Sequence, residues 1–309
     1  MNSTNVESID NDSSPYGYIP TQSIAIVFLV LFSVSTIAHT GQATYSRMWW
    51  LLPTVTFCGI LEILGWAARV WSSISPLQDT PFTIQITATI IGPTPLLAAN
   101  FVILGKIIEH LGPAYSRLSP KWYAIVFCTG DVVSLVIQAI GGGIASSASE
   151  NNEDPTLGGN IILAGISIQM AMISLYALCA IEFFVRYLKY APVRQLSFAV
   201  GVSSPVRGFL DKHMCWMCIA LMFSTICLFI RAVYRTIELS DGWDGRIIST
   251  QVYFNVLDGA MIVLAMYTLN FGHPAYLLDA SRRRDGGKPV TSIEMKDGVK
   301  GTESMQALA

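Results

Sequence analysis

The chain has 309 residues, of which 52% are hydrophobic and only 13% are charged, and its formal net charge is −2. Soluble domains carry about 25% charged residues, so this composition excludes an ordinary soluble domain and indicates a membrane protein. There is no basic excess that would attract nucleic acid, and we expect no nucleic-acid partner.

The first 18 residues form a polar segment with three acids and no Lys or Arg. It therefore lacks the basic region that begins a secretory signal peptide. The segment carries N-x-[ST] sequons at Asn2 and Asn11, which would place it outside the cell if they are glycosylated. We expect residues 1–18 to be a polar extracellular N-terminus.

Seven apolar segments follow, each of about the 20 residues that a helix needs to cross the hydrocarbon core. Their approximate bounds are 19–40, 48–71, 82–105, 122–147, 160–185, 214–237 and 250–272. The sequence thus predicts an all-α membrane protein, with a seven-helix transmembrane domain over residues 19–279. The longest inner loop, 186–213, is basic and could dock a cytosolic partner.

Positive charge is distributed unevenly between the two sides of the predicted bundle. Fifteen of the 19 Lys and Arg residues lie on the side of the C-terminal tail, and Arg246 alone lies in a loop on the other side. Because cytoplasmic loops carry the excess of Lys and Arg, the N-terminus is predicted outside and the C-terminus in the cytosol. Residues 280–309, rich in Gly, Lys and acids, are predicted to be a disordered cytosolic tail.

Ionisable residues within a span cost about 2.5–3.5 kcal/mol each and call for a partner or an aqueous cavity. In the second segment, Glu62 and Arg69 are seven residues apart and share one helical face. Arg69 lies near the outer surface, so it either snorkels to the interface or faces the bundle. In the third segment, Pro93 and Pro95 are predicted to kink the helix and to free backbone carbonyls.

The fourth segment places Asp131 and Gln138 on one face, again seven residues apart. The glycines at 141–143 that follow either allow another helix to approach closely or let the helix unwind. The neutral polar residues of other spans more often join helices than bind ligands.

The sixth segment ends in a charged stripe. Arg231, Arg235 and Glu238 are spaced i, i+4 and i+7, and Glu238 can pair with Arg235 at i+3. Arg231 is left for a carboxylate of another helix, either Glu62 or Asp258, which lies about 12 Å from the outer end of the seventh segment by helical rise.

These charges fit two arrangements, a structural ion-pair network or a polar cavity that opens toward the outer leaflet. For the second, the candidate substrate-binding residues are Glu62, Arg69, Asp131, Gln138, Arg231, Arg235, Glu238 and Asp258. An amphiphile with an amine head would place its ammonium beside the acids.

Other chemistries have weaker support. The four histidines (His39, His110, His213 and His273) map near inner helix ends, as in a metal-dependent lipid hydrolase, but no pair has the spacing that places two ligands on one helical face. Cys215 and Cys218 match C-x-x-C without the context of a redox motif and are interpreted as helix packing. No Walker, G-x-S-x-G or dinucleotide-binding motif occurs, so we expect no cofactor, no ATP-driven transport and no enzyme activity.

Residues 16–274 resemble the fungal resistance-to-aminocholesterol-like family, also called lipid-translocating exporters. The matching pieces are ExxGWxxR (62–69), DVVSLVIQAIGGG (131–143), GISIQ (165–169), RAVYRTIE (231–238), Asp258 and the closing His273–Pro274. The resemblance implies a multi-pass protein of the plasma membrane or an endomembrane, linked to sphingoid long-chain base export and to resistance against amphiphilic toxicants.

The leading hypothesis is therefore an ATP-independent transporter of sphingoid bases or related amphiphiles, with membrane lipids around it. A lipid-responsive receptor of seven helices is the alternative, and a metal-dependent membrane lipid hydrolase is a second alternative.

Overall fold

The computed structural model describes residues 16–151, 153–193, 208–241 and 245–277. The sequons at Asn2 and Asn11, the tail at 280–309 and the middle of the basic loop lie outside these ranges. Within them the chain is helical, with no strand, and seven helices are long and apolar enough to span a membrane. The protein is thus a multi-pass membrane protein, as the sequence predicts.

The spans run over Gln22–Tyr45, Trp49–Ile74, Asp79–Leu111, Pro120–Ala148, Thr156–Leu188, Lys212–Ser240 and Gln251–Leu277. Each overlaps its predicted segment, and most extend about one turn further. The first, fifth and sixth spans are single helices, α1 (Gln22–Tyr45), α6 (Thr156–Leu188) and α7 (Lys212–Ser240), and the fourth lies in α5 (Pro120–Glu150).

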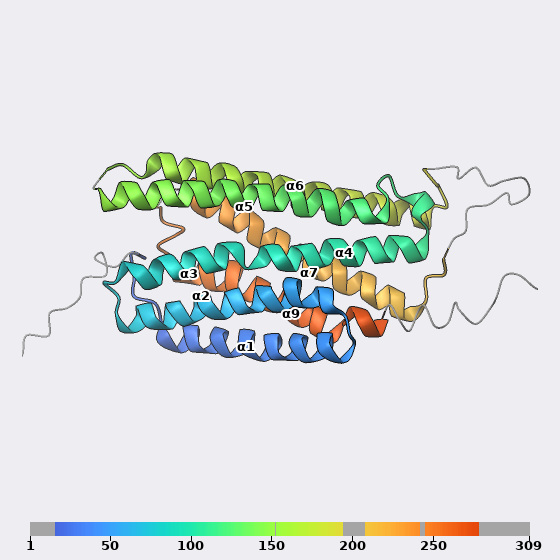
Figure 1. Ribbon diagram of the computed structural model, residues 1–309, viewed down its shortest axis with the longest axis horizontal. Helices are drawn as coiled ribbons and strands as arrows, with labels where there is room; N and C mark the ends of the chain where they lie inside the picture. Colours follow the sequence, from blue (N-terminus) through green and yellow to red (C-terminus); the bar gives the residue numbers. More distant parts are fainter. Residues whose placement is uncertain (1–15, 152, 194–207, 242–244, 278–309) are drawn as a thin grey trace, which may run out of the picture.

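The helices run roughly along one long axis, so the bundle has two ends (Figure 1). We call them the Tyr16 end, where α1 starts, and the His273 end, where the seventh span finishes. In Figure 1, α5 and α6 lie side by side along one flank and α1 lies along the opposite flank. Helix α7 crosses behind α4 and contacts α4, α6 and α9, so it is the central helix of the bundle.

The third span has a break in its helical hydrogen bonding, as its prolines predict, and Gly92 at the break keeps helical backbone angles (φ −48°, ψ −49°). Helix α3 (Asp79–Ile91) ends before Gly92, and α4 (Pro93–Leu111) begins with proline at its first position. Proline has no N–H to donate to the carbonyl four residues earlier, so the Thr89 carbonyl loses its helical partner.

The second and seventh spans each contain a π-helical segment, which no local sequence pattern indicates. The second span consists of the 3₁₀ turn η2 (Trp49–Leu51), η3 (Leu52–Thr56) and α2 (Phe57–Ile74). The seventh consists of α8 (Gln251–Tyr253), η5 (Phe254–Ala260) and α9 (Met261–Phe271). The segments η3 and η5 are π-helical, and η5 holds Asp258. Such segments inside α-helices occur frequently at functional sites.

The glycine run in α5 serves close packing and does not unwind the helix, which is continuous through it. A Cβ at Gly141 would lie 2.8 Å from the Gly158 carbonyl oxygen of α6, whereas a Cβ at Gly143 would meet nothing within 4 Å. Small residues let transmembrane helices approach closely, and Gly141 is the member of the run that does so.

Candidate functional site

The charged stripe of α7 faces the seventh span inside the bundle. Arg231 Nε donates to Asp258 Oδ1 at 2.8 Å, and Arg235 donates to the same carboxylate through Nε at 3.1 Å and Nη2 at 2.8 Å. All three side chains are at most 6% exposed. Of the two predicted partners for Arg231, the structure selects Asp258.

Within the stripe, Arg235 pairs with Glu238, as the i+3 spacing predicts. Arg235 Nη1 donates to Glu238 Oε2 at 2.8 Å, and the Tyr234 hydroxyl donates to Glu238 Oε1 at 2.6 Å. The two guanidinium groups thus face two carboxylates, which neutralises the cluster. We call Arg231, Arg235, Glu238 and Asp258 the charge network.

The charge network also holds the break in the third span. Arg231 Nη2 donates to the Thr89 carbonyl at 2.6 Å, and Arg235 Nη2 donates to the Thr89 hydroxyl at 3.0 Å. The Thr89 carbonyl is the one that Pro93 leaves without a helical donor. A side chain of α7 therefore replaces the missing backbone hydrogen bond and couples α7 to the break.

Glu62 lies close to this network without joining it by a hydrogen bond. Its side chain is completely buried, and neither carboxyl oxygen has a hydrogen-bond partner in the described part of the chain. A Cβ at Gly92 would lie 2.5 Å from Glu62 Oε1, so the carboxyl occupies the space that the missing side chain leaves beside the α3–α4 break.

Asp131 is the second acid without a partner. It is 1% exposed, and both oxygens lack hydrogen bonds to any described residue. Ser134 and Gln138 are buried on the same face of α5, where Ser134 is bonded to the Gly130 carbonyl. A buried carboxyl with neither a counter-charge nor a hydrogen-bond donor is costly, which sets Asp131 apart from the paired Asp258.

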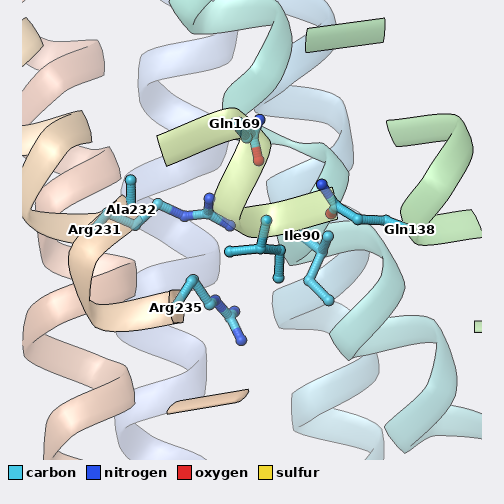
Figure 2. Close-up of a pocket in the computed structure, with 7 residues that line it drawn as sticks. Ile90, Gln138, Gln169, Arg231, Ala232 and Arg235 are labelled. Carbon is cyan, nitrogen blue, oxygen red and sulfur yellow. The ribbon is translucent and has the colours of Figure 1, made fainter. Parts of the chain in front are cut away.

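A small cavity of about 10 Å³ lies between the charge network and α5. Its polar walls are Gln138, Gln169, Arg231 and Arg235, and Ile90, Ile166 and Ala232 complete it. Figure 2 shows the Gln138 amide and the Arg231 guanidinium pointing toward each other from opposite sides. The predicted ion-pair network is therefore present, and it forms one wall of a small polar cavity.

Arg69 is enclosed at the Tyr16 end of the bundle, and the snorkelling alternative does not describe it. The side chain is 1% exposed, and Nη2 donates to the Tyr18 hydroxyl at 2.7 Å. Its guanidinium carbon lies 4.5 Å from the ring centre of Phe254 and 5.3 Å from that of Tyr16. Among the described residues Arg69 makes no ion pair, and aromatic faces stabilise it instead.

Burial raises the pKa of the Tyr16 phenol, which shares a hydrogen bond of 3.0 Å with Ser72. Tyr16 therefore stays neutral beside Arg69. The rings of Tyr16 and Tyr18 join the chain segment before α1 to the second span, a contact that no local sequence pattern signals.

Neutral polar side chains join helices elsewhere, as expected. Asn100 Nδ2 donates to the Ser224 hydroxyl at 3.1 Å between α4 and α7, and Gln169 Nε2 donates to the Thr94 hydroxyl at 2.9 Å between α6 and α4. Thr89 was not singled out in the sequence, although its position four residues before Pro93 was the available signal.

The metal and redox alternatives gain no geometric support within the described residues. No three His, Cys, Asp or Glu side chains there are grouped so that they could hold a metal ion. Cys215 and Cys218 are free thiols in the first turns of α7.

Fold and site together define a seven-helix membrane protein whose interior holds a neutralised charge network and two carboxyls without a hydrogen-bond partner among the described residues. The family model described as "RTA1 like protein" matches residues 55–281. The chain belongs to the RTA1-like family, which confirms its resemblance to the resistance-to-aminocholesterol-like proteins.

Three yeast relatives are similar over most of the chain. The sphingoid long-chain base transporter RSB1 of Saccharomyces cerevisiae (strain ATCC 204508 / S288c) is 27% identical, over 93% of this chain and 79% of the relative. Protoporphyrin uptake protein 1 of the same strain is 24% identical, over 83% and 91%. Protein RTM1 of Saccharomyces cerevisiae is 26% identical, over 83% and 92%. No solved structure matches the chain with significance.

Proposed function

We propose that this protein is an ATP-independent transporter of single-chain amphiphiles with an amine head, and that sphingoid long-chain bases are its substrate class. The family and the name of the relative RSB1 support a role in lipid transport. The proposal includes a place in the plasma membrane, and it puts the N-terminus outside because of the Lys and Arg distribution of the loops. No enzyme activity and no cofactor are part of it.

The observation that carries the proposal is the contrast between the acids inside the spans. Asp258 and Glu238 are paired with arginine, whereas Glu62 and Asp131 have no hydrogen-bond partner among the described residues. A substrate ammonium supplies the hydrogen-bond donors that both carboxyls lack, and it supplies Asp131 with a positive charge as well. Glu62 already lies in the field of Arg231 and Arg235, whose own hydrogen bonds go to Asp258 and Thr89. The alkyl chain of the substrate can remain between helices or in the surrounding lipid.

Movement of the substrate requires a second arrangement of the helices, because the cavity of about 10 Å³ is far too small for a lipid. The α3–α4 break is where such a change is easiest, since one backbone hydrogen bond is already absent there. We propose that Arg231 and Arg235 hold Asp258 and Thr89 when the site is empty. They would release Thr89 as the third span bends.

The test is export of sphingoid bases from cells that carry Asp131→Asn or Glu62→Gln at wild-type levels in the membrane. Both changes keep the size of the side chain and remove its charge, and we expect at least a tenfold fall in export. Glu182→Gln is the matched control, because Glu182 is 31% exposed and pairs with surface arginines. Export at the wild-type rate by both site variants would refute the mechanism.

Two further outcomes would favour one of the alternative functions over transport. Ligand-dependent recruitment of a cytosolic protein, without movement of lipid in reconstituted vesicles, would favour a receptor. Bound zinc in the purified protein would favour a hydrolase.

A further inference from the structure

One face of α5 carries Asp131, Ser134 and Gln138, all of them buried. Gln138 is 6% exposed, and neither its amide oxygen nor its amide nitrogen has a hydrogen-bond partner among the described residues. Buried amides are normally hydrogen-bonded because an unpaired polar group is costly. Gln138 thus offers one acceptor and two donors to whatever enters the adjacent cavity.

The cavity has room for a single hydroxyl group. Its volume is about 10 Å³, close to the minimum that holds one water-sized group. Guanidinium groups of Arg231 and Arg235 line the side opposite Gln138 (Figure 2), and they can only donate hydrogen bonds.

These surroundings select among polar groups. A hydroxyl can donate to the Gln138 amide oxygen while it accepts from the amide nitrogen or a guanidinium. An ammonium has donors alone, so it cannot accept a hydrogen bond from the amide nitrogen or from the guanidinium groups. A phosphate is much larger than the space. A hydroxyl is therefore the group that fits.

We infer that Gln138 recognises a hydroxyl of the substrate headgroup while Asp131 holds its ammonium, so that the site selects long-chain amino alcohols over simple long-chain amines. This inference rests on the proposed function and adds the residue that determines specificity. Sphingoid bases carry a 2-amino-1,3-diol head, in which each hydroxyl lies on a carbon bonded to the carbon that bears the amine.

The spacing of the two side chains suits such a head. Seven residues of helix rise about 10 Å. An ammonium and a neighbouring hydroxyl, with a hydrogen bond at each end, span about 8 Å. Asp131 does not line the cavity, so the head would extend from the cavity along this face of α5 to reach it. Side chains lean toward the N-terminus of their helix, which favours this direction for the longer Gln138 side chain.

The experiment compares two labelled substrates with the same 18-carbon chain, a 2-amino-1,3-diol and the plain amine, in liposomes that contain the purified full-length protein. Movement is measured as the rate above that of protein-free vesicles. We expect the wild type to move the diol about tenfold faster than the amine. Gln138→Met keeps the volume and removes the amide, so it should slow the diol about tenfold and leave the amine within twofold.

Gln251→Met is the matched control, because Gln251 does not line the cavity and accepts a hydrogen bond from Thr21 at 3.1 Å. It should leave both rates within twofold. Equal slowing of both substrates by Gln138→Met, or slowing of neither, would overturn the inference.

If Gln138→Met does not fold, substrates that lack one hydroxyl decide the question with the wild type. There are two such substrates, one without the 1-hydroxyl and one without the 3-hydroxyl. At least one of them must move as slowly as the plain amine, and otherwise the inference is wrong. A wild type that moves diol and amine equally contradicts only the inference. A wild type that moves neither contradicts the proposed function as well.

Discussion

Removal of the Asp258 charge should destabilise the bundle strongly, because this carboxylate holds two buried arginines. In Asp258→Asn the volume is kept, but the three charge-assisted hydrogen bonds from Arg231 and Arg235, at 2.8, 3.1 and 2.8 Å, lose their anionic acceptor. Breaking a buried ion pair from one side typically costs about 3–5 kcal/mol, since the remaining charge stays buried without compensation.

For a chain of this size, each kcal/mol lowers the midpoint of thermal unfolding by about 2 °C. We therefore expect Asp258→Asn to lower the midpoint by about 6–10 °C, measured from tryptophan fluorescence of the purified protein in detergent.

Glu182 provides a matched control with the same connectivity. It also accepts hydrogen bonds from two arginines, Arg117 and Arg186, both with a shortest distance of 2.7 Å, but it is 31% exposed and Arg117 is 64% exposed. Exposed ion pairs contribute about 0–1 kcal/mol, so Glu182→Gln should lower the midpoint by about 2 °C or less. The reasoning would be refuted if Asp258→Asn unfolds within 2 °C of the wild type, or if both variants lose the same stability.

Two further predictions concern packing and the enclosed arginine. Gly141→Leu should cost about 1–3 kcal/mol because its Cβ would lie 2.7 Å from the backbone of α6, whereas Gly143→Leu, with nothing within 4 Å, should cost less than about 0.5 kcal/mol. Equal unfolding midpoints for the two leucine variants would contradict this. Tyr18→Phe removes the 2.7 Å hydrogen bond that Arg69 donates and should cost about 1.5–3 kcal/mol, while Tyr45→Phe, at a side chain 94% exposed, should cost nothing measurable. The same midpoint for both tyrosine variants would show that the hydrogen bond from Arg69 to Tyr18 does not stabilise the bundle.

The features that were predictable from the sequence are those that depend on spacing along one helix. Apolar length predicts the spans, Pro93 predicts the break in the third, and the i+3 spacing predicts the pair of Arg235 with Glu238. Each depends on residues a few positions apart, for which helical geometry fixes the neighbours.

The remaining features depend on how helices dock against each other. No local sequence pattern indicates that η5 is π-helical or that Asp258 pairs with Arg231. Nor does any local pattern indicate that Arg231 donates a hydrogen bond to the Thr89 carbonyl. The contact of Tyr18 with Arg69 joins residues 51 positions apart. A charge count predicts that acids and arginines neutralise one another. Only the packed structure separates Asp258, which is paired with arginine, from Asp131, which has no hydrogen-bond partner in the described part of the chain.

The proposed transport is tested most directly with purified protein in liposomes free of ATP, scored for movement of a labelled sphingoid base across the bilayer with and without a proton gradient. We predict movement clearly above that of protein-free vesicles, reduced at least tenfold by Asp131→Asn and unchanged by Glu182→Gln. No movement above protein-free vesicles under either condition, or an undiminished rate in Asp131→Asn, would contradict the central claim that the buried carboxyls carry the amine head through the bundle.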